Sequence, residues 1–306
     1  MPRVGLNELD LTPGKRARLY RMLYAHGPGH GLGMFLPIDQ GLEHGPRDFF
    51  PNPDSQDPEF ELRLAEEGNF SAIVFQVGVA AKYIGRYAGR VPLVVKLNGK
   101  TEIPSDEEAL SPLIASVEDA VRLGADAVGY TLYVGSPAQD RDFVQFSQVR
   151  QEAERLGMPV IVWSYPRGKF VNAKGGQLTS WAIEYAARVA MELGADLVKV
   201  NLPEVDPDKA QQTPAPYNKT TFDEEEAIRR VVDAAGRTPV LVSGGSRVDE
   251  EDVLHKARMS IRCGATGLIF GRNVWQRPFP EALALTRKIR EIVAEESGVA
   301  VPALHR

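Results

Sequence analysis

The chain has 306 residues, of which 43% are apolar and 25% are charged, so it is long enough to bury a large core. Its net charge of −5 at pH 7 does not favour a broad basic surface, and we expect no nucleic-acid partner. The single cysteine, Cys263, excludes an internal disulfide framework and is typical of a reducing compartment. We expect a cytoplasmic protein without a membrane partner, because residues 1–5 begin no apolar signal segment and no apolar run reaches about 18 residues.

Eight short apolar segments are predicted to be β-strands. The first, residues 34–39, ends at the carboxylate of Asp39 and is followed by a loop rich in proline and aspartate that reaches Pro58. The other seven lie at residues 72–76, 92–97, 127–131, 159–163, 197–200, 239–243 and 267–270.

Amphipathic helices are predicted before the first strand and between most of the others. They lie at residues 12–26, 59–68, 116–123, 147–156, 181–193 and 224–235. The sequence Leu-Gly-Ala-Asp recurs at residues 123–126 and 193–196, where glycine would end a helix before the next strand. Strands that alternate with helices in this way predict an α/β protein whose parallel sheet closes as a (β/α)8 TIM barrel.

We expect one domain over residues 1–306, with a short helical extension at about residues 1–32. The structural alternative is an open, doubly wound sheet. The barrel is favoured because no Gly-x-Gly-x-x-Gly turn follows the first strand. Polar residues also gather at the ends of many strands, whereas an open sheet would collect them at one switch point.

Residues 201–223 do not fit the barrel pattern. This segment contains four prolines and is too long for an ordinary connection between a strand and a helix. Because it follows the sixth predicted strand directly, we interpret it as a lid or a subunit contact. A passive surface loop is the alternative.

The sixth predicted strand carries a lysine in an otherwise apolar run. Side chains alternate along a strand, so Leu197, Lys199 and Asn201 share one face, and neither face of this strand indicates solvent. Burial of an ammonium group lowers its pKa and favours the neutral amine, which is a nucleophile. A pKa of about 7 to 8, against an ordinary value of about 10.4, would raise the neutral fraction at pH 7 several-hundred-fold. Lys199 is therefore a candidate for Schiff-base formation, and the alternative is a strand-end lysine whose ammonium extends into water.

Polar residues gather at the C-terminal ends of the predicted strands, where the chemistry of a barrel takes place. They are Asp39 and His44 after the first strand, Lys96 and Asn98 on the third, Trp163 and Tyr165 on the fifth, Lys199 on the sixth, Ser243, Gly244 and Gly245 after the seventh, and Gly271, Arg272 and Asn273 after the eighth. A carbon–carbon lyase that works through an imine would need groups of these kinds.

The loops after the seventh and eighth strands form the usual phosphate site of this fold. Glycine lets backbone N–H groups approach an anion, and arginine adds a charge with two donors. The predicted phosphate ligands are Ser243, Gly244, Gly245, Gly271 and Arg272. Glycine pairs also occur in such loops merely to allow tight turns, so the prediction depends on the two loops together.

Three residues at the strand ends are candidates for acid–base chemistry or for shaping the cavity. Tyr165 could transfer protons next to an amine, whereas Trp163 is expected to line the cavity. Asp39 could cap a helix. Its place at the mouth of an apolar strand favours a role in protonating or orienting a carbinolamine hydroxyl.

Three cationic or titratable residues are candidates for contact with substrate. Arg167 follows Tyr165 in a turn and, together with His44, could hold a second phosphate, although it could also be only a turn residue. Lys96 is a second cation that would help to lower the pKa of Lys199, and it could itself be the nucleophile. We favour Lys199 as the nucleophile and place Lys96 among the substrate-binding residues.

Six segments, in this order, resemble the archaeal-type class I fructose-1,6-bisphosphate aldolases of the deoxyribose-phosphate aldolase superfamily. They are LPIDQGLEHG at residues 36–45, VKLN at 95–98, WSY at 163–165, GADLVK at 194–199, SGG at 243–245 and FGRNVWQ at 270–276. None is specific singly, but jointly they extend from the first strand to the eighth.

The resemblance implies a metal-independent aldolase without a cofactor, which splits fructose 1,6-bisphosphate into dihydroxyacetone phosphate and glyceraldehyde 3-phosphate in glycolysis or gluconeogenesis. By position, Lys199 would form the Schiff base, Tyr165 would act as acid and base for C3–C4 cleavage, and Asp39 would assist imine formation. One phosphate would lie on the two glycine loops, and the other would lie near His44 and Arg167. Members of this family are commonly homo-oligomers.

Three other functions stay open as alternatives. Related barrels with the same lysine run other chemistry, such as aminodeoxyheptulosonate synthesis, so the acceptor is less certain than the imine. A zinc aldolase is disfavoured, because of the five histidines only His44 lies at a strand end. A non-catalytic barrel that binds sugar phosphates would need the anion site but not a nucleophile.

Overall fold

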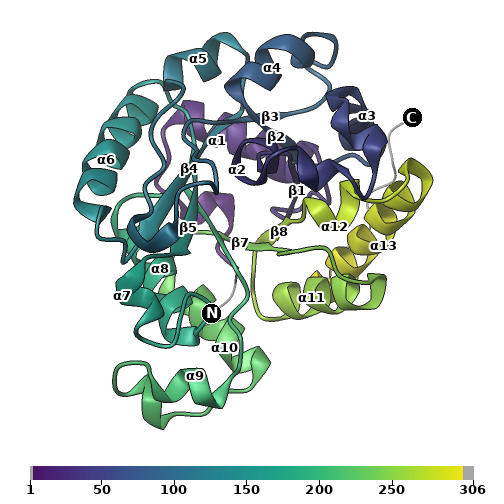
Figure 1. The fold of residues 1–306 in the computed structure, drawn as a ribbon. Helices are drawn as coiled ribbons and strands as arrows, with labels where there is room; N and C mark the ends of the chain where they lie inside the picture. Colours follow the sequence, from purple (N-terminus) through teal and green to yellow (C-terminus); the bar gives the residue numbers. More distant parts are fainter. Residues whose placement is uncertain (1–2, 299–306) are drawn as a thin grey trace.

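The computed structural model describes residues 3–298 and contains a closed barrel of parallel strands (Figure 1). The strands are β1 (Gly33–Pro37), β2 (Ala72–Gln76), β3 (Leu93–Lys96), β4 (Ala127–Val134), β5 (Val160–Pro166), β6 (Leu197–Val200), β7 (Val240–Ser243) and β8 (Gly267–Ile269). Each strand pairs with the next in the chain, and β8 pairs with β1 to close the sheet. The predicted (β/α)8 barrel is therefore confirmed.

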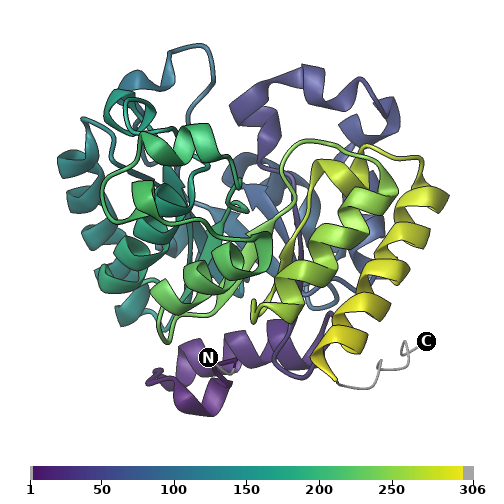
Figure 2. The ribbon, with the colours of Figure 1, turned by 90° about the horizontal axis from the view of Figure 1, so that it is seen from below.

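Helices surround the barrel, and the N-terminal helices lie across one of its ends (Figures 1 and 2). The α-helices are α1 (Pro13–Tyr20), α2 (Gln40–His44), α3 (Pro58–Glu67), α4 (Val77–Tyr83), α5 (Val117–Arg122), α6 (Gln139–Arg155), α7 (Lys169–Asn172), α8 (Ser180–Glu192), α9 (Pro207–Gln211), α10 (Glu224–Ala234), α11 (Glu250–Arg262), α12 (Arg272–Trp275) and α13 (Phe279–Ser297). Shorter turns are η1 (Leu6–Glu8), the π-type η2 (Arg21–Ala25), η3 (Pro46–Phe49), η4 (Pro53–Gln56), η5 (Ile84–Arg86), η6 (Asp106–Glu108) and η7 (Tyr217–Lys219). Within residues 3–298, no helix is long and apolar enough to span a membrane.

Local sequence signals explain where many of these helices begin and end. Ser116 and Asp119 form a reciprocal capping box at the start of α5, and Asp223 accepts a backbone N–H at the start of α10. The two Leu-Gly-Ala-Asp segments follow α5 and α8. Their glycines, Gly124 and Gly194, have φ angles of 70° and 95°, which only glycine adopts readily.

The structure differs from the predicted boundaries mainly around β4 and β5. Both strands extend further, to Val134 and Pro166, and remain paired through Tyr133 and Tyr165. The polar and aromatic residues there interrupt the apolar run that indicates a strand, yet they belong to it; the hydroxyl of Ser164, for example, donates to the carbonyl of Ala186 on α8. Helix α6 likewise begins at Gln139, upstream of the predicted residue 147, because its polar first turn conceals the helical period.

The core has two layers separated by the sheet. Inside the barrel, alternate strand residues such as Phe35, Val74, Ile161 and Leu197 form one apolar cluster. The other face of each strand packs against the surrounding helices, as Val198 and its neighbours do. The alternation expected for the sixth strand is therefore observed.

The N-terminal helices close the end of the barrel opposite the mouth (Figure 2). Leu19 and Met22 belong to the apolar cluster inside the barrel. Lys15 forms an ion pair of 2.9 Å with Asp196, the acidic residue of the second Leu-Gly-Ala-Asp segment. Arg21 contacts the corresponding residue of the first segment, Asp126, at 3.4 Å. The two repeated segments therefore supply the anchors for this N-terminal plug, which consists of α1 and η2.

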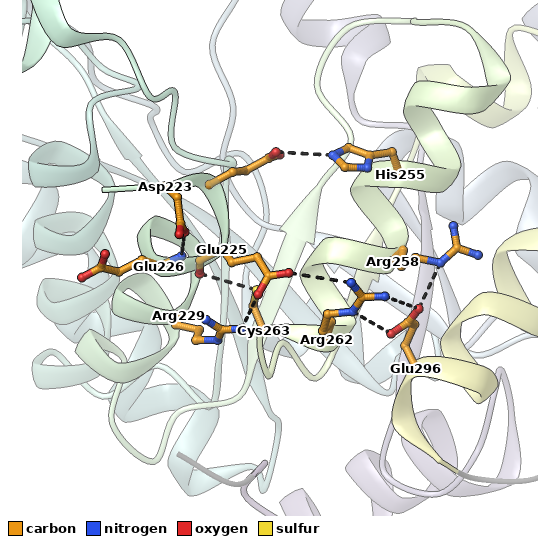
Figure 3. A network of polar contacts seen from close by, with 10 residues as sticks. Asp223, Glu225, Glu226, Arg229, His255, Arg258, Arg262, Cys263 and Glu296 are labelled. Atoms are coloured by element: carbon orange, nitrogen blue, oxygen red, sulfur yellow. Dashed lines mark hydrogen bonds and ion pairs between the residues drawn. The ribbon is translucent and has the colours of Figure 1, made fainter. Parts of the chain in front are cut away.

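Ion pairs join three neighbouring helices on one side of the barrel (Figure 3). Glu296 of α13 accepts hydrogen bonds of 3.0 Å from both Arg258 and Arg262 of α11. Arg262 also pairs with Glu225 of α10 at 3.7 Å. This network fixes the spacing of α10 and α11, each of which contributes one residue to the cavity described below.

The segment 201–223 is folded onto α8 and α10. Within it, Tyr217 donates a hydrogen bond of 2.8 Å to Glu184 of α8, and Arg230 of α10 donates to the same carboxylate at 2.9 Å. Near its start, Glu204 donates its backbone N–H to the carbonyl of Leu178 at 2.7 Å. These contacts fix both parts of the segment against the barrel wall.

Helix α3 contains a buried carboxyl group without a hydrogen-bond partner among the described residues. Glu61 is 0% exposed, and among the described residues neither of its carboxyl oxygens has a hydrogen-bond partner. Burial raises the pKa of Glu61 well above its ordinary 4.5, and the charge of Asp57 acts in the same direction. The folded protein therefore keeps the proton on Glu61 to a higher pH than the unfolded chain does.

We expect this proton to make stability depend on pH. The pKa is higher in the folded state, so the free energy of unfolding should fall as pH rises from about 4.5 through the folded-state value. Replacing Glu61→Leu should remove this slope and raise the free energy of unfolding at pH 7 by about 1–3 kcal/mol. Urea denaturation at several pH values measures both effects, with Glu67→Gln, an exposed position on the same helix, as the control. An unchanged slope in Glu61→Leu would contradict the prediction.

Candidate active site

A cavity of about 520 Å³ opens at the C-terminal ends of the strands. All but one of the predicted site residues line it: Asp39, His44, Trp163, Tyr165, Arg167, Lys199, Ser243, Gly244, Gly245, Gly271 and Arg272. The exception is Lys96, which lies behind the wall of the cavity with 0% exposure. Among the described residues, no group of three or more His, Cys, Asp or Glu side chains is placed to hold a metal ion.

Lys199 lies on β6, and its amine is close to two aromatic rings of β5. Its Nζ is 5.0 Å from the ring centre of Trp163 and 5.6 Å from that of Tyr165. Burial lowers the pKa of the Lys199 ammonium from its ordinary 10.5 to about 8. The negative charge of Asp39 acts against this shift, and the positive charge of Arg272 acts with it. A substantial fraction of Lys199 is therefore a neutral, nucleophilic amine near neutral pH.

Lys96 provides the counter-charge for two carboxylates next to Lys199. Its Nζ lies 3.3 Å from Asp39 and 3.5 Å from Glu43, and 4.9 Å from the ring centre of Trp163. Burial alone would raise the pKa of Asp39, but the charges of Lys96 and Lys199 outweigh it and hold that pKa below its usual value. Asp39 is therefore an ionised carboxylate at the cavity wall.

Tyr165 follows Trp163 by two residues and faces the same cavity. Burial raises the pKa of its phenol above the ordinary 10.0, and the charges of Asp39 and Glu43 raise it further. The side chain is therefore a neutral phenol that can donate a proton. The guanidinium of Arg167 lies 5.2 Å from its ring centre, which is close enough for a cation–π contact.

The two glycine-rich loops lie side by side, as the sequence predicts. Asn273 joins them, because its Nδ2 donates to the carbonyl of Gly244 at 3.0 Å and its Oδ1 accepts from the N–H of Val248 at 2.9 Å. A Cβ atom at Gly244 would lie 2.7 Å from Asn273, so this close approach requires glycine. The hydroxyl of Ser243 donates to Asn201 at 2.6 Å.

The structure changes the expected grouping of the cations. His44 is predicted to hold a second phosphate together with Arg167, but its Nδ1 lies 3.4 Å from Arg272 and 2.8 Å from Asp48. Arg167 instead contacts Asp106, which follows β3, at 3.4 Å. His44, at the end of α2, thus lies beside the loop that follows β8, a long-range contact that the sequence alone does not reveal.

Several residues that line the cavity were missed in the sequence. Glu43 has a recognisable signal, since it lies four residues after Asp39, where a helix would place both on one face. Asn201 continues the inward face of β6 beyond Lys199. Gln177, Leu178, Glu224 and Lys256 also line the cavity. They come from helices and loops whose approach to the mouth depends on packing, which no local pattern encodes.

A buried amine beside a phenol and a carboxylate, in the mouth of a (β/α)8 barrel, defines an imine-forming lyase class. The model of the DeoC/LacD family aldolases matches residues 33–277. The class 1 fructose-bisphosphate aldolase of Thermoproteus tenax is 42% identical, with coverage of 89% of this chain and 93% of that protein. A protein of Methanocaldococcus jannaschii named fructose-bisphosphate aldolase/6-deoxy-5-ketofructose 1-phosphate synthase is 35% identical, with coverage of 87% and 82%.

Solved structures give the same result. An archaeal fructose-1,6-bisphosphate aldolase, with its catalytic lysine covalently bound to the carbinolamine intermediate of the substrate, is 39% identical and superposes with a TM-score of 0.76 over 90% of this chain and 98% of that one. The fructose-bisphosphate aldolase of Slackia heliotrinireducens is 28% identical with a TM-score of 0.82, over 100% and 99%. The chain belongs to the DeoC/LacD family of aldolases, and the resemblance drawn from the sequence is confirmed.

We expect the reactivity of Lys199 to follow its lowered pKa. The neutral amine is the reactive form, so the rate of imine formation should rise with pH and level off above about 8. Incubation with dihydroxyacetone at each pH, followed by borohydride reduction at one fixed pH, measures this rate. In Arg272→Gln the loss of a positive charge should move the rise to higher pH. A rise centred near 10.5 in the unmodified protein would contradict the burial argument.

Proposed function

We propose that this protein is a class I, Schiff-base aldolase that cleaves fructose 1,6-bisphosphate reversibly into dihydroxyacetone phosphate and glyceraldehyde 3-phosphate. The observation that carries the proposal is Lys199, whose burial lowers its pKa to about 8 inside a cavity shared with Tyr165 and Asp39. The relatives named as class 1 fructose-bisphosphate aldolases support the choice of substrate.

The first step is imine formation at Lys199. Its neutral Nζ attacks the C2 carbonyl carbon of the open-chain ketose, and the phenol of Tyr165 donates its proton to the hydroxyl of the resulting carbinolamine, which leaves as water. Water can supply this proton when the phenol is absent. The protonated imine is positively charged, and the ionised carboxylate of Asp39 stabilises it. Lys96 keeps Asp39 ionised and oriented, so we assign Lys96 to the support of Asp39 and withdraw it from direct contact with the substrate.

The second step is cleavage of the C3–C4 bond. The phenolate oxygen of Tyr165, formed in the first step, takes the proton of the C4 hydroxyl, the C3–C4 electron pair moves into the protonated imine to give an enamine, and the aldehyde leaves. The positive charge at Lys199 stabilises the transient phenolate. Tyr165 then donates the proton to C3 of the enamine, and water releases dihydroxyacetone phosphate. In the synthetic direction the neutral phenol, which burial favours, is the proton donor.

The phosphates occupy opposite sides of the cavity. The C1 phosphate lies next to the carbon bound to Lys199, and we assign it to the neighbouring loops of β7 and β8. Its ligands are Ser243, Gly244, Gly245, Gly271 and Arg272, with His44 beside Arg272. We assign the C6 phosphate to Arg167 at the end of β5, and Trp163 lines the space between.

A second candidate has the same imine and a different acceptor. The Methanocaldococcus jannaschii relative, whose name includes 6-deoxy-5-ketofructose 1-phosphate synthase, favours it. A panel of phosphorylated and unphosphorylated aldehydes with dihydroxyacetone phosphate separates the two, because only the bisphosphate aldolase should prefer glyceraldehyde 3-phosphate.

We also propose a homo-oligomer that acts in the cytoplasm, in the breakdown or synthesis of sugar phosphates. The single cysteine, Cys263, which is buried and unpaired by any disulfide, supports a reducing compartment. Light scattering measures the oligomeric state directly.

The proposed function is tested by borohydride trapping with fructose 1,6-bisphosphate in the presence of a chelator, followed by peptide mass mapping. We expect an adduct on Lys199 and none in Lys199→Met, whose turnover should fall on the order of 10⁴-fold or more. Tyr165→Phe should still form the adduct but cleave about 10²–10⁴-fold more slowly. An adduct on Lys96 would move the nucleophile, and no adduct on any lysine of the folded protein would contradict the aldolase.

A further inference from the structure

The segment between β3 and α5 places an acidic strap beside the cavity. We define the acidic strap as residues 102–109, which include four carboxylates. It is tethered at both ends. The N–H of Glu102 donates to the carbonyl of Glu43 at 2.8 Å, and the hydroxyl of Ser136 donates to the carbonyl of Ala109 at 2.6 Å.

Between these tethers the strap is held mainly by ion pairs. Residues 103–108 are all exposed, with Ile103 at 89%. Among the described residues, no backbone hydrogen bond joins 103–108 to another segment. Asp106 pairs with Lys100 at 2.7 Å and with Arg167 at 3.4 Å, and Glu108 pairs with Lys169 at 3.2 Å. The middle of the strap can therefore move without breaking the barrel framework.

Asp106 forms an ion pair with Arg167, the cation that the proposed function assigns to the C6 phosphate. The side chain of Arg167 lines the cavity and is 18% exposed, and that of Lys100 is 14% exposed, whereas that of Asp106 is 52% exposed. Two largely covered cations thus share one exposed carboxylate at the rim. A phosphate has the charge and the acceptor oxygens to take the same place.

We infer that Asp106 occupies the site of the substrate's second phosphate in the free protein, between Lys100 and Arg167, and that the phosphate displaces it. This inference rests on the proposed function and extends it to two residues outside the cavity wall. Lys100 becomes a second ligand of the C6 phosphate, and Asp106 is an internal competitor for it.

The exchange is favourable because the two anions differ in charge and in exposure. An exposed carboxylate pair is weak, since water and salt screen it, whereas a phosphate dianion brings about two charges to the same cations. Displacing Asp106 nevertheless has a cost, which lowers the apparent affinity for a substrate that carries this phosphate. A substrate without this phosphate leaves Asp106 in place, so its apparent affinity is not lowered in this way.

The test compares the KM of fructose 1,6-bisphosphate with that of fructose 1-phosphate in three variants. Asp106→Asn removes the competitor but keeps the shape, and should lower KM for the bisphosphate about two- to fivefold with kcat unchanged within about twofold. Lys100→Gln should raise that KM about fivefold or more. Neither should alter KM for fructose 1-phosphate. Glu108→Gln is the matched control, because it removes an ion pair of the same strap with Lys169, which does not line the cavity.

Three results would overturn the inference. They are a raised or unchanged bisphosphate KM in Asp106→Asn, an equal fall for both substrates, and the same fall in Glu108→Gln. If Asp106→Asn does not fold, Lys100→Gln still tests the inference. An unchanged KM for fructose 1,6-bisphosphate in Lys100→Gln would overturn it. Turnover of fructose 1,6-bisphosphate by the unmodified protein is measured first. Its absence rejects the proposed function, whereas normal turnover with unaltered variants rejects only the role of the strap.

Discussion

The structure depends on the burial of two lysines in the mouth of one barrel. Lys96 and Lys199 are 0% and 4% exposed, and an unpaired buried charge costs several kcal/mol. The fold divides the available carboxylates unequally, since Lys96 contacts both Asp39 and Glu43, while Lys199 faces the rings of Trp163 and Tyr165. The two amines therefore have different surroundings. Lys96 orients a carboxylate, whereas burial lowers the pKa of Lys199 to about 8, and Lys199 is the nucleophile of the proposed reaction.

The elements around the mouth hold this charge pattern in place from several directions. The pairing of β5 with β6 sets Trp163 opposite Lys199, and Asn273 ties the loops of β7 and β8 together. The ion pairs among α10, α11 and α13 fix the outer helices of that side (Figure 3). By contrast, the acidic strap contacts the rim mainly through exposed charges. The rigid part of the site therefore surrounds Lys199 and the glycine-rich loops, where we propose the imine and the first phosphate, and the adjustable part lies beside Arg167, where we propose the second phosphate.

Much of the fold could be predicted because its signals are local. Strand-length apolar runs separated by amphipathic helices indicated the barrel, and β2 and β6 have the predicted bounds. The inward face of β6 and the polar strand ends also located the cavity, since strand order alone brings those ends together. The neighbours of His44 and Arg167 were not predictable. They depend on the positions of α2 and of residues 99–116. Long-range packing determines both positions, and it produces no periodic pattern in the sequence. The role of Lys96 behind the wall was missed for the same reason, because alternation gives the face of a strand but not the depth of a side chain.

The N-terminal plug also constrains the order in which the chain can fold. It is synthesised before the strands that it closes, yet Asp126 lies 105 residues beyond Arg21, and Asp196 lies 181 residues beyond Lys15. Until β4 and β6 have been made, its apolar residues have no barrel interior to pack against and its cations have no carboxylates to pair with. Contacts of such long separation form slowly, because the entropy of the intervening chain is lost before the contact is gained. Although it is synthesised before the strands of the barrel, the plug is therefore among the last parts to reach its native place, and a nascent barrel remains open at its base through most of its synthesis.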